Sequence, residues 1–257
     1  MRVPSFDSAV ANYSAFLKSE GRELSRQRVE AHVESWHDWS PLHTVDDVRQ
    51  WFTECRDGCT MWVEHIPLEH CKGWSLNSES GYIEHESGDF FYVQGLRTSV
   101  THMREVASGW DQPMLTQVGY DGGILGLIRK RFDGVPLYLV EAKAEPGNYK
   151  LIQLSPTLQA TYANINQAHK GRRPLFVEYF LGETACPVEV LYDQFLSEDG
   201  GRLMNKRNRG MLVEVPADHA IELPNENFRW VSLWQIKACL KENAWVNPHI
   251  RGIIAHL

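Results

Sequence analysis

The sequence lacks any apolar run that approaches the roughly 20 residues needed to span a bilayer. It also lacks an excess of basic residues, because 26 Lys and Arg stand against 33 Asp and Glu and give a net charge of -7. Nucleic acids and anionic membranes attract basic surfaces, so we expect neither as a general partner. The five cysteines are an odd number and no signal-like segment follows Met1, so the sequence predicts reduced thiols and a cytoplasmic location.

Several catalytic motifs are missing as well. There is no Walker loop, no glycine-rich dinucleotide fingerprint and no GxSxG nucleophile elbow, so ATP hydrolysis, bound NAD and serine-hydrolase chemistry lose their usual signatures. The Cys and His residues between positions 55 and 71 fit no paired-ligand spacing of a zinc site. We therefore predict no cofactor and no metal. The residues considered as metal ligands are Cys55, Cys59, His65, His70 and Cys71.

A charged N-terminal segment precedes the main part of the chain. Residues 6–34 carry apolar positions at uneven helical spacing, which predicts helices with few long-range anchors, and we assign 1–43 to an N-terminal helical arm. An amphipathic helix is predicted over 45–56, with Thr44 as its N-cap and two acidic residues in its first turn. With 43% hydrophobic residues the chain can bury one large core, so 44–257 is predicted to be a single domain.

Short β-rich stretches dominate the middle of this domain. Asp133-Gly134, between two apolar stretches, predicts a tight hairpin. Strands in near succession, without a helix after each one, predict an α+β fold with a mixed or largely antiparallel sheet and flanking helices. The predicted strands span 88–100, 123–132, 135–143, 174–182, 187–197 and 209–216.

Helices are predicted at two later places. Ser155-Pro156 has the pattern of an N-cap followed by proline at the first helical position, with apolar residues spaced for one face before Gly171. The second predicted helix begins after Ser232 and turns Leu233, Ile236 and Leu240 inward.

Charged residues alternate at the end of the strand predicted over 135–143. Glu141, Lys143 and Glu145 project from one face if the strand continues, while Val140 and Ala142 project from the other. Such a row suits acid-base chemistry. It also suits a solvated sheet surface, and the residues alone leave both interpretations open.

Other residues allow two interpretations each. Lys206, Arg207 and Arg209 crowd together in an acidic chain, which suits phosphate but also a solvated hairpin loop. His85 has the chemistry of an acid or base, or it packs as an ordinary hydrogen-bonded residue. Trp110 can stack on a base or sugar, or belong to the core.

Six sequence blocks occur in a fixed order: GYIEHESGDFFYVQGLRT, WDQPMLTQ, GGILGLIRKRFDGVPLYLVEAKAEPGN, LSPTLQAT, SEDGGRLMNKRNRGMLVE and FRWVSLWQIKACL…VNPHIRGIIAHL. Together they resemble the NDP-hexose 2,3-dehydratases of deoxysugar biosynthesis, from about Gly81 to Leu257. The resemblance implies a modified Nudix-like α+β domain. A Nudix catalytic box with its paired glutamates is missing, so magnesium-dependent pyrophosphate hydrolysis is not expected.

The resemblance also implies a reaction. The expected substrate is a dTDP-4-keto-6-deoxy-hexose, whose C4 ketone makes the C3 hydrogen acidic. Loss of the C2 hydroxyl then gives an enol that becomes a 3,4-diketo-2,6-dideoxy sugar. Because the ketone is already present in the substrate, no cofactor is required.

Site residues follow from this chemistry and from the matching blocks. The elimination needs a base for C3, a donor or cation for the C4 enolate and an acid for the C2 hydroxyl. We expect Glu145 as the base and Lys143 as the enolate stabiliser or proton donor, with Tyr162 or His85 as the acid. The expected substrate-binding residues are Arg97, Trp110, Gln112, Gln117, Asn148, Gln153, Ser155, Thr157, Gln159, Lys206, Arg207, Asn208 and Arg209.

The resemblance implies an assembly too. Members of the family carry two homologous halves in one chain, and this sequence carries one copy, so we expect a two-fold homodimer that reproduces the fused pair. An alternative from another functional class is a non-catalytic protein that binds sugar nucleotides or regulates their use on the same fold.

Overall fold

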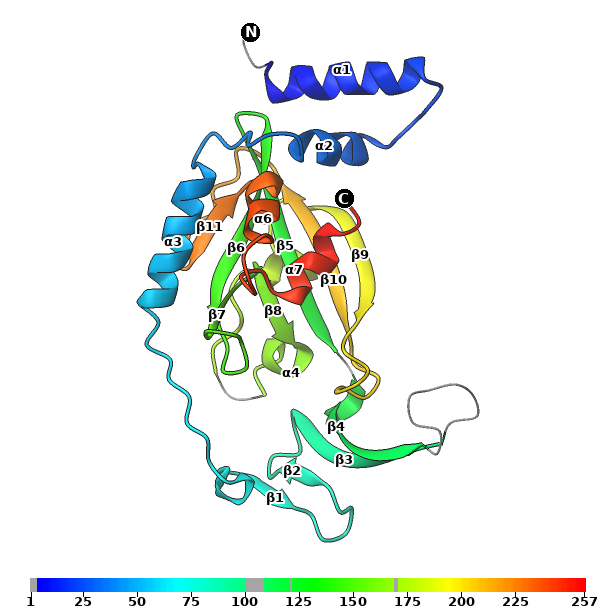
Figure 1. The fold of residues 1–257 in the computed structure, drawn as a ribbon, viewed down its shortest axis with the longest axis vertical. Helices are drawn as coiled ribbons and strands as arrows, with labels where there is room; N and C mark the ends of the chain where they lie inside the picture. The colour runs from blue at the N-terminus through cyan, green and yellow to red at the C-terminus, as the bar shows by residue number, and fades with distance from the viewer. Residues whose placement is uncertain (1–3, 100–108, 121, 169–170) are drawn as a thin grey trace.

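The computed structural model describes residues 4–99, 109–120, 122–168 and 171–257, and the first three residues of the predicted arm lie outside this part. The described helices and strands form an α+β architecture, as predicted (Figure 1). None of the described helices is long and apolar enough to cross a membrane.

Three helices begin the chain, and the third starts after Thr44, as its cap signal predicts. These are α1 (Phe6–Ser19), α2 (Arg26–Glu34) and α3 (Val45–Asp57). Thr44 and Asp47 form a capping box at the start of α3, since each side chain accepts a hydrogen bond from the other's backbone N–H. The expectation that the first two helices have few anchors is wrong: Val33 of α2 is fully buried, and Glu30 pairs with Arg129 of the sheet.

A small antiparallel sheet follows α3 after a segment over 58–73 that is extended apart from the short 3-10 helix η1 (Leu68–His70). Its strands are β1 (Trp74–Leu76), β2 (Ile83–His85), β3 (Phe91–Thr98) and β4 (Trp110–Gln117), in that order. In Figure 1 this sheet extends from one end of the main body. The strand predicted over 88–100 corresponds to β3, and its last position lies outside the described residues.

The main sheet is mixed. It contains β5 (Gly123–Phe132), β6 (Val135–Ala144), β7 (Ile152–Pro156), β8 (Leu158–Thr161), β9 (Glu189–Ser197), β10 (Arg207–Val215) and β11 (Phe228–Val231). The path β11-β6-β5-β10-β9 is antiparallel except where β10 runs parallel to β5. Asp133 (φ 49°) and Gly134 (φ 81°) make the predicted tight turn between β5 and β6, where both positions need the left-handed region.

Strands β7 and β8 follow each other in the chain and pair with the two strands of the β5–β6 hairpin where these separate. β7 pairs with β6, and β8 pairs with β5, so the chain crosses from one strand of the hairpin to the other at Thr157. The buried Thr157 hydroxyl accepts a hydrogen bond from Ile128 N–H (2.9 Å) and donates one to the Leu139 carbonyl (2.5 Å). It therefore satisfies two backbone groups at the point where the hairpin opens.

The helix predicted from Ser155 is wrong, because pairing with β6 and β5 draws 152–161 into β7 and β8. Only α4 (Tyr162–Ile165) is helical there, with Thr161 as its cap, and positions 169–170 of the predicted segment lie outside the described residues. The strand predicted over 174–182 is also wrong. That segment forms α5 (Val177–Leu181). Its Phe180 ring packs directly on Gly126, since a Cβ atom at position 126 would lie only 2.4 Å from the ring.

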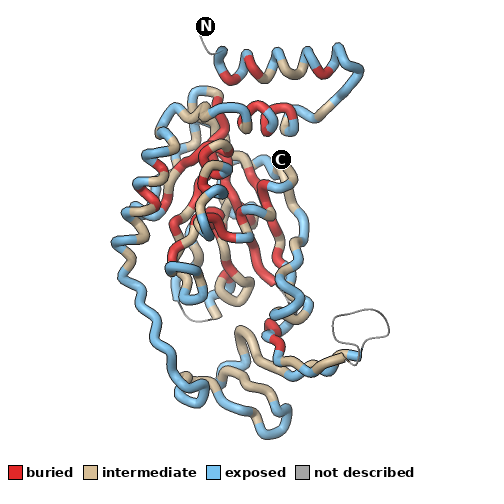
Figure 2. The backbone as a smooth tube through the Cα atoms, viewed as in Figure 1, coloured by how far each residue is buried: buried red, intermediate tan, exposed pale blue. Residues whose placement is uncertain are grey.

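The last helices match the cap signals. α6 (Leu233–Cys239) starts with a capping box between Ser232 and Gln235, and α7 (Pro248–Ile254) starts after Asn247. Leu240 is 40% exposed, contrary to the prediction that it faces inward, because α6 ends before it. Helices α3, α6 and α7 pack on one face of the main sheet, and α1 and α5 pack on the other, so that the strands between them are buried (Figure 2).

Candidate functional site

The end of β6 carries the charged row that the sequence predicted. Val140 and Ala142 are fully buried, whereas Glu141 and Lys143 are half-buried on the other face. The Lys143 Nζ lies 3.5 Å from Glu141 Oε2. Burial raises the pKa of the Glu141 carboxyl, and the charge and hydrogen bond of Lys143 oppose that rise. The row is therefore neither a core strand nor a fully solvated surface.

Glu145 directly follows β6 and belongs to a chain of hydrogen bonds. Gln159 of β8 donates from Nε2 to Glu145 Oε1 at 2.9 Å. Asn247, the cap of α7, donates to Gln159 Oε1 at 3.0 Å and to Ser155 Oγ at 2.8 Å. The segment 245–247 lies beside β7, because Leu154 exchanges backbone hydrogen bonds with Trp245 and Asn247. Distant parts of the sequence thus meet at one carboxylate.

A cavity of about 340 Å³ opens beside this row. Lys143 and Gln159 contribute one wall, and Asn164, Gln167 and Arg172 contribute others. The lining consists mainly of hydrogen-bonding side chains. It can hold a small polar ring such as a pyranose, whose hydroxyl groups need several donors and acceptors.

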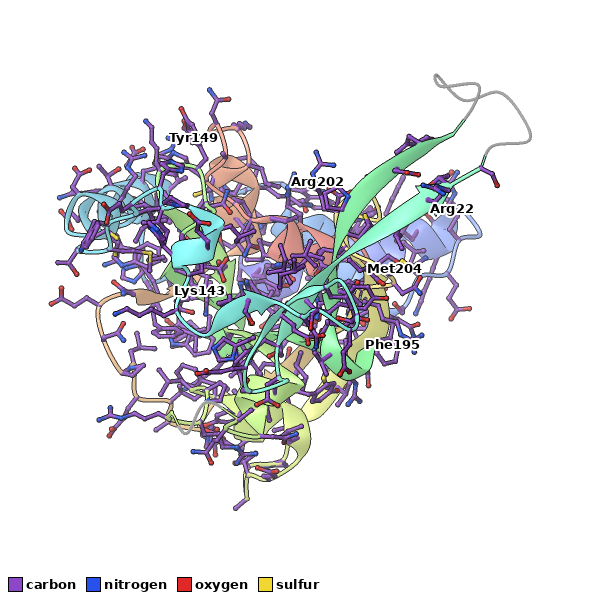
Figure 3. The ribbon with its side chains drawn as sticks, turned by 90° about the horizontal axis from the view of Figure 1, so that it is seen from below. Arg22, Lys143, Tyr149, Phe195, Arg202 and Met204 are labelled. Atoms are coloured by element: carbon purple, nitrogen blue, oxygen red, sulfur yellow. The ribbon has the colours of Figure 1, made fainter. Side chains whose placement is uncertain are left out.

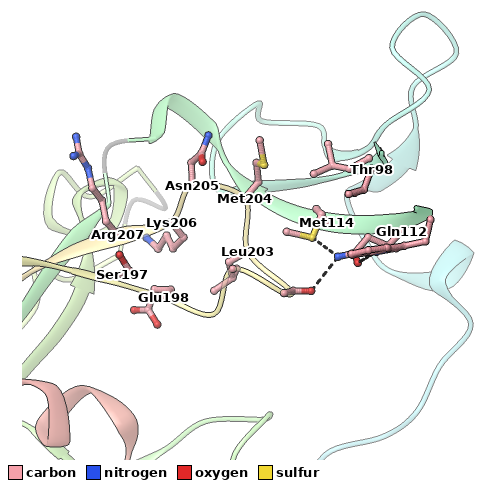
Figure 4. Close-up of a pocket in the computed structure, with 14 residues that line it drawn as sticks. Thr98, Gln112, Met114, Ser197, Glu198, Leu203, Met204, Asn205, Lys206 and Arg207 are labelled. Carbon is pink, nitrogen blue, oxygen red and sulfur yellow. Dashed lines mark hydrogen bonds between the residues drawn. The ribbon is translucent and has the colours of Figure 1, made fainter. Parts of the chain in front are cut away.

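A larger cavity, of about 900 Å³, lies between the small sheet and the β9–β10 hairpin (Figure 4). Backbone hydrogen bonds from Leu115 to Arg202 and from Met204 to Leu115 join the hairpin loop to β4 and shape this cavity. Its lining combines apolar side chains such as Leu96, Met114 and Leu203 with basic ones. Seen from below, Lys143 lies to the left of the molecule and Phe195 and Met204 lie to the right (Figure 3).

Two cations border the larger cavity. Lys206 Nζ donates to Gln117 Oε1 and lies 5.6 Å from the centre of the Phe91 ring. Burial lowers the pKa of Lys206, while the charge of Glu198 raises it. Arg207 is exposed, with its guanidinium 4.7 Å from the centre of the Phe195 ring. Arg207 therefore keeps donors for an anion.

The other two arginines predicted to bind phosphate already hold carboxylates. Arg209 donates from Nε to Asp193 at 2.7 Å, and its guanidinium also lies near Tyr162. Arg97 makes two hydrogen bonds to Asp111, at 3.0 and 2.8 Å, and its neighbours Leu96 and Thr98 line the larger cavity while Arg97 projects elsewhere.

The remaining predicted residues fall into two groups. Trp110 and Gln112 line the larger cavity; Trp110 donates to Gln112, which in turn donates to the Gly201 carbonyl at 3.1 Å (Figure 4). The others make structural hydrogen bonds: Asn148 to the carbonyls of Lys143 and Leu151, Gln153 to the Ala244 carbonyl, and Asn208 to Glu198.

His85 lies apart from the β6 row, in the small sheet. Its Nδ1 is 2.8 Å from Ser87 Oγ, and its ring packs edge-on against Trp74 and Phe90. In the described part of the chain, no three His, Cys, Asp or Glu side chains gather in a way that would hold a metal ion.

Sequence reasoning missed three residues at these cavities. Glu198 lines the larger cavity and lies 3.5 Å from His249 Nδ1, and Arg172 lines the smaller one. Asn247 was missed as a partner of Gln159. The Asn247-Pro248 pair is a helix-start signal, so the cap was predictable, but the contact across 88 residues was not.

The structure defines an α+β protein with a polar cavity beside β6 and β8 and a larger cavity between the small sheet and the β9–β10 hairpin. A family model described as NDP-hexose 2,3-dehydratase matches residues 45–257. The chain belongs to the NDP-hexose 2,3-dehydratase family, which confirms the resemblance in its sequence.

Curated relatives are similar over most of this chain. A dTDP-4-dehydro-6-deoxy-α-D-glucopyranose 2,3-dehydratase of Amycolatopsis orientalis is 37% identical over 217 residues, which cover 83% of this chain and 44% of the relative. A protein of the same description from Saccharopolyspora spinosa is 39% identical over 193 residues, covering 75% of this chain and 38% of the relative. The chain thus matches less than half the length of these relatives.

A solved structure is also similar. A Nudix hydrolase from M. smegmatis is 14% identical, with a TM-score of 0.31, and the match covers 58% of this chain and 92% of that chain. A TM-score this low carries no argument about function.

Proposed function

We propose that this chain catalyses the cofactor-independent 2,3-dehydration of a dTDP-4-keto-6-deoxy-hexose in deoxysugar biosynthesis, in the cytoplasm. Membership of the family supports the reaction class, and the description of the curated relatives supports the substrate. The observation that carries the proposal is that Lys143 lines a polar cavity together with Gln159, whose amide donates a hydrogen bond to the half-buried Glu145.

The reaction is an elimination of water. A base takes the C3 proton, which the C4 ketone acidifies, and the electrons of that bond form the enolate. The C2–O bond then breaks, and the hydroxyl leaves with a proton from an acid. The resulting C2–C3 enol tautomerises to a ketone at C3, so atoms and charge balance without an oxidant or reductant.

In this proposal Glu145 takes the C3 proton. Its carboxylate is held by the Gln159 amide, which leaves further lone pairs on the carboxylate for a substrate proton. Lys143 stabilises the enolate, since its side chain lines the cavity and, among the described residues, Glu141 alone has a carboxylate within ion-pair distance of its ammonium group. Tyr162, next to Arg209, is better placed than His85 to serve as the acid, because His85 lies in the small sheet.

The nucleotide part requires different groups. We assign thymine and diphosphate to the larger cavity, where Trp110 offers an aromatic ring and Lys206 and Arg207 offer cations. Arg209 and Tyr162 would then lie between nucleotide and sugar, since Tyr162 follows β8, whose Gln159 lines the smaller cavity.

The proposal is tested by incubating the chain with dTDP-4-keto-6-deoxyglucose. Loss of water from the substrate, followed by release of dTDP, supports the dehydratase. Saturable binding of dTDP without turnover would instead favour a non-catalytic sugar-nucleotide-binding protein, the alternative drawn from the sequence.

A homodimer is part of the same proposal. Apolar side chains are exposed on the extended segment between α3 and β1, which runs outside the main body (Figure 1): Trp62 is 77% exposed, Leu68 56% and Ile66 49%. Isolated exposed apolar residues are ordinary, but several on one segment indicate that another protein surface buries them. The relatives are more than twice as long as the region matched here, so a second copy is the occupant we propose. Trp62→Ser should shift the mass measured by light scattering from dimer to monomer; an unchanged dimer would remove this segment from the interface.

A further inference from the structure

We infer that Asn247 is a positioning residue for Glu145, because it fixes which end of the Gln159 amide faces the carboxylate. The inference deepens the proposed function, since it rests on Glu145 as the base. The chain of hydrogen bonds runs from a helix start, through two amide side chains, to the carboxylate.

Helix α7 sets the orientation of the Asn247 amide, with which this series of hydrogen bonds begins. The backbone N–H of Ile250 donates to Asn247 Oδ1 at 3.0 Å. A backbone N–H can only donate, so the oxygen of Asn247 must face α7 and its amino group must face away. Exchange of the Asn247 oxygen and nitrogen would place two donors against each other.

The second member follows from the first. The two hydrogens of Asn247 Nδ2 point to Ser155 Oγ at 2.8 Å and to Gln159 Oε1 at 3.0 Å. Gln159 must therefore present its oxygen to Asn247, and its Nε2 is left facing Glu145 Oε1 at 2.9 Å. Each group has the partner that its chemistry requires.

We call the hydrogen-bonded series Asn247–Gln159–Glu145 the relay, and burial keeps it in this orientation. Asn247 is 2% exposed and Ser155 is fully buried, so water is not available to pair with a reversed amide. The amide thus presents a donor to Glu145 Oε1, where a reversed amide would present an oxygen. Charged groups near the relay are Glu141 and Lys143 on the same strand and Arg172 across the cavity.

Asn247→Asp is the variant that isolates this role. Aspartate caps a helix as well as asparagine, so α7 should keep its start and the circular dichroism spectrum should match that of the wild type, although the buried carboxylate lowers the melting temperature. The new side chain has no hydrogen to give to Gln159, whose amide should then reverse and turn its oxygen toward Glu145. We expect the acid limb of the pH profile of kcat to move up by about one pH unit.

Two further variants separate the relay from the added charge. Ser25→Asp places the same charge at the exposed cap of α2 and should leave the profile unchanged. Gln159→Leu removes the donor itself and should shift the profile as Asn247→Asp does. In the double variant the two shifts should not add, because both act through one amide, whereas a direct effect of the charge would add.

The relay also has a readout that needs no turnover. In ¹H–¹⁵N NMR spectra of the free protein, the side-chain amide signal of Gln159, assigned with Gln159→Leu, should move in Asn247→Asp. If this signal moves but the chain dehydrates no substrate, the proposed function fails and the relay stands. If the signal and the kcat profile stay in place in Asn247→Asp, or if the two shifts add, the relay is overturned.

Discussion

The Arg129 guanidinium and the Glu30 carboxylate form an ion pair at 2.5 Å in which the side chains are only 1% and 3% exposed. Arg131 contacts the same carboxylate oxygen at 2.7 Å. Burial would raise the pKa of Glu30, but the hydrogen bond from Arg131 and the charges of Arg129 and Arg131 outweigh it and hold the pKa low. This pair joins α2 to the centre of β5.

Glu30→Ala should lower the free energy of unfolding by about 3 kcal/mol, the lower end for a broken buried ion pair, because Glu214 still pairs with the buried Arg129. Urea unfolding measures the change. Arg26→Ala is the matched control: Arg26 also bonds Glu30, but its side chain is 79% exposed, so the loss should stay below about 1 kcal/mol. Equal losses in the two variants would show that burial of the pair does not matter.

The neighbouring Glu34 should make stability depend on pH. Burial raises the pKa of Glu34 to about 7, and Tyr138 Oη donates to its carboxylate at 2.9 Å. An acid whose pKa is raised in the folded state holds more protons there than in the unfolded chain. Its stabilising contribution is therefore complete below about pH 4.5 and is lost as the pH rises through about 7.

Glu34→Gln removes the titrating group and should flatten that loss. Urea unfolding between about pH 5 and pH 8 tests this, with the slope of stability against pH as the measured quantity. If the variant keeps the slope of the wild type, Glu34 is not the group responsible.

Glu145→Gln and Lys143→Ala should each lower kcat by roughly 100 to 10,000-fold, the usual effect of removing a proton-transfer group or an enolate-stabilising cation. The Kd for dTDP, measured by calorimetry, should stay nearly unchanged, since neither residue lines the larger cavity. Lys150→Ala is the control for loss of a lysine, because Lys150 is exposed beside Tyr149. Full activity in both site variants would refute these assignments.

Arg207→Ala should weaken dTDP binding by about tenfold, since a hydrogen bond to a charged group contributes about 1.5–3 kcal/mol. Arg97→Ala should change the Kd little, because that guanidinium is already held by Asp111. A larger rise in Kd for Arg97→Ala than for Arg207→Ala would show that the phosphates bind at β3 and not at the β9–β10 hairpin.

Local signals predicted the elements whose ends they define. The caps at Thr44 and Ser232 and the Asp133-Gly134 turn appear as expected, because these signals act within a few residues. Ser155-Pro156 failed as a helix start because pairing with β6 and β5 outweighed it, and 174–182 failed as a strand because it packs as α5 on Gly126.

The site shows the same division. Alternation along β6 predicted that Glu141 and Lys143 share a face, which the structure confirms. The pairing of Arg209 with Asp193 joins the neighbouring strands β10 and β9, and that of Gln159 with Asn247 joins segments 88 residues apart. No spacing rule within one element predicts such contacts.

The most direct test of the central claim is mass spectrometry of dTDP-4-keto-6-deoxyglucose incubated with this chain alone. We expect the sugar nucleotide to lose one water in the presence of the wild-type chain and not in the presence of Glu145→Gln. Intact substrate after incubation with a wild-type chain that binds dTDP would contradict it.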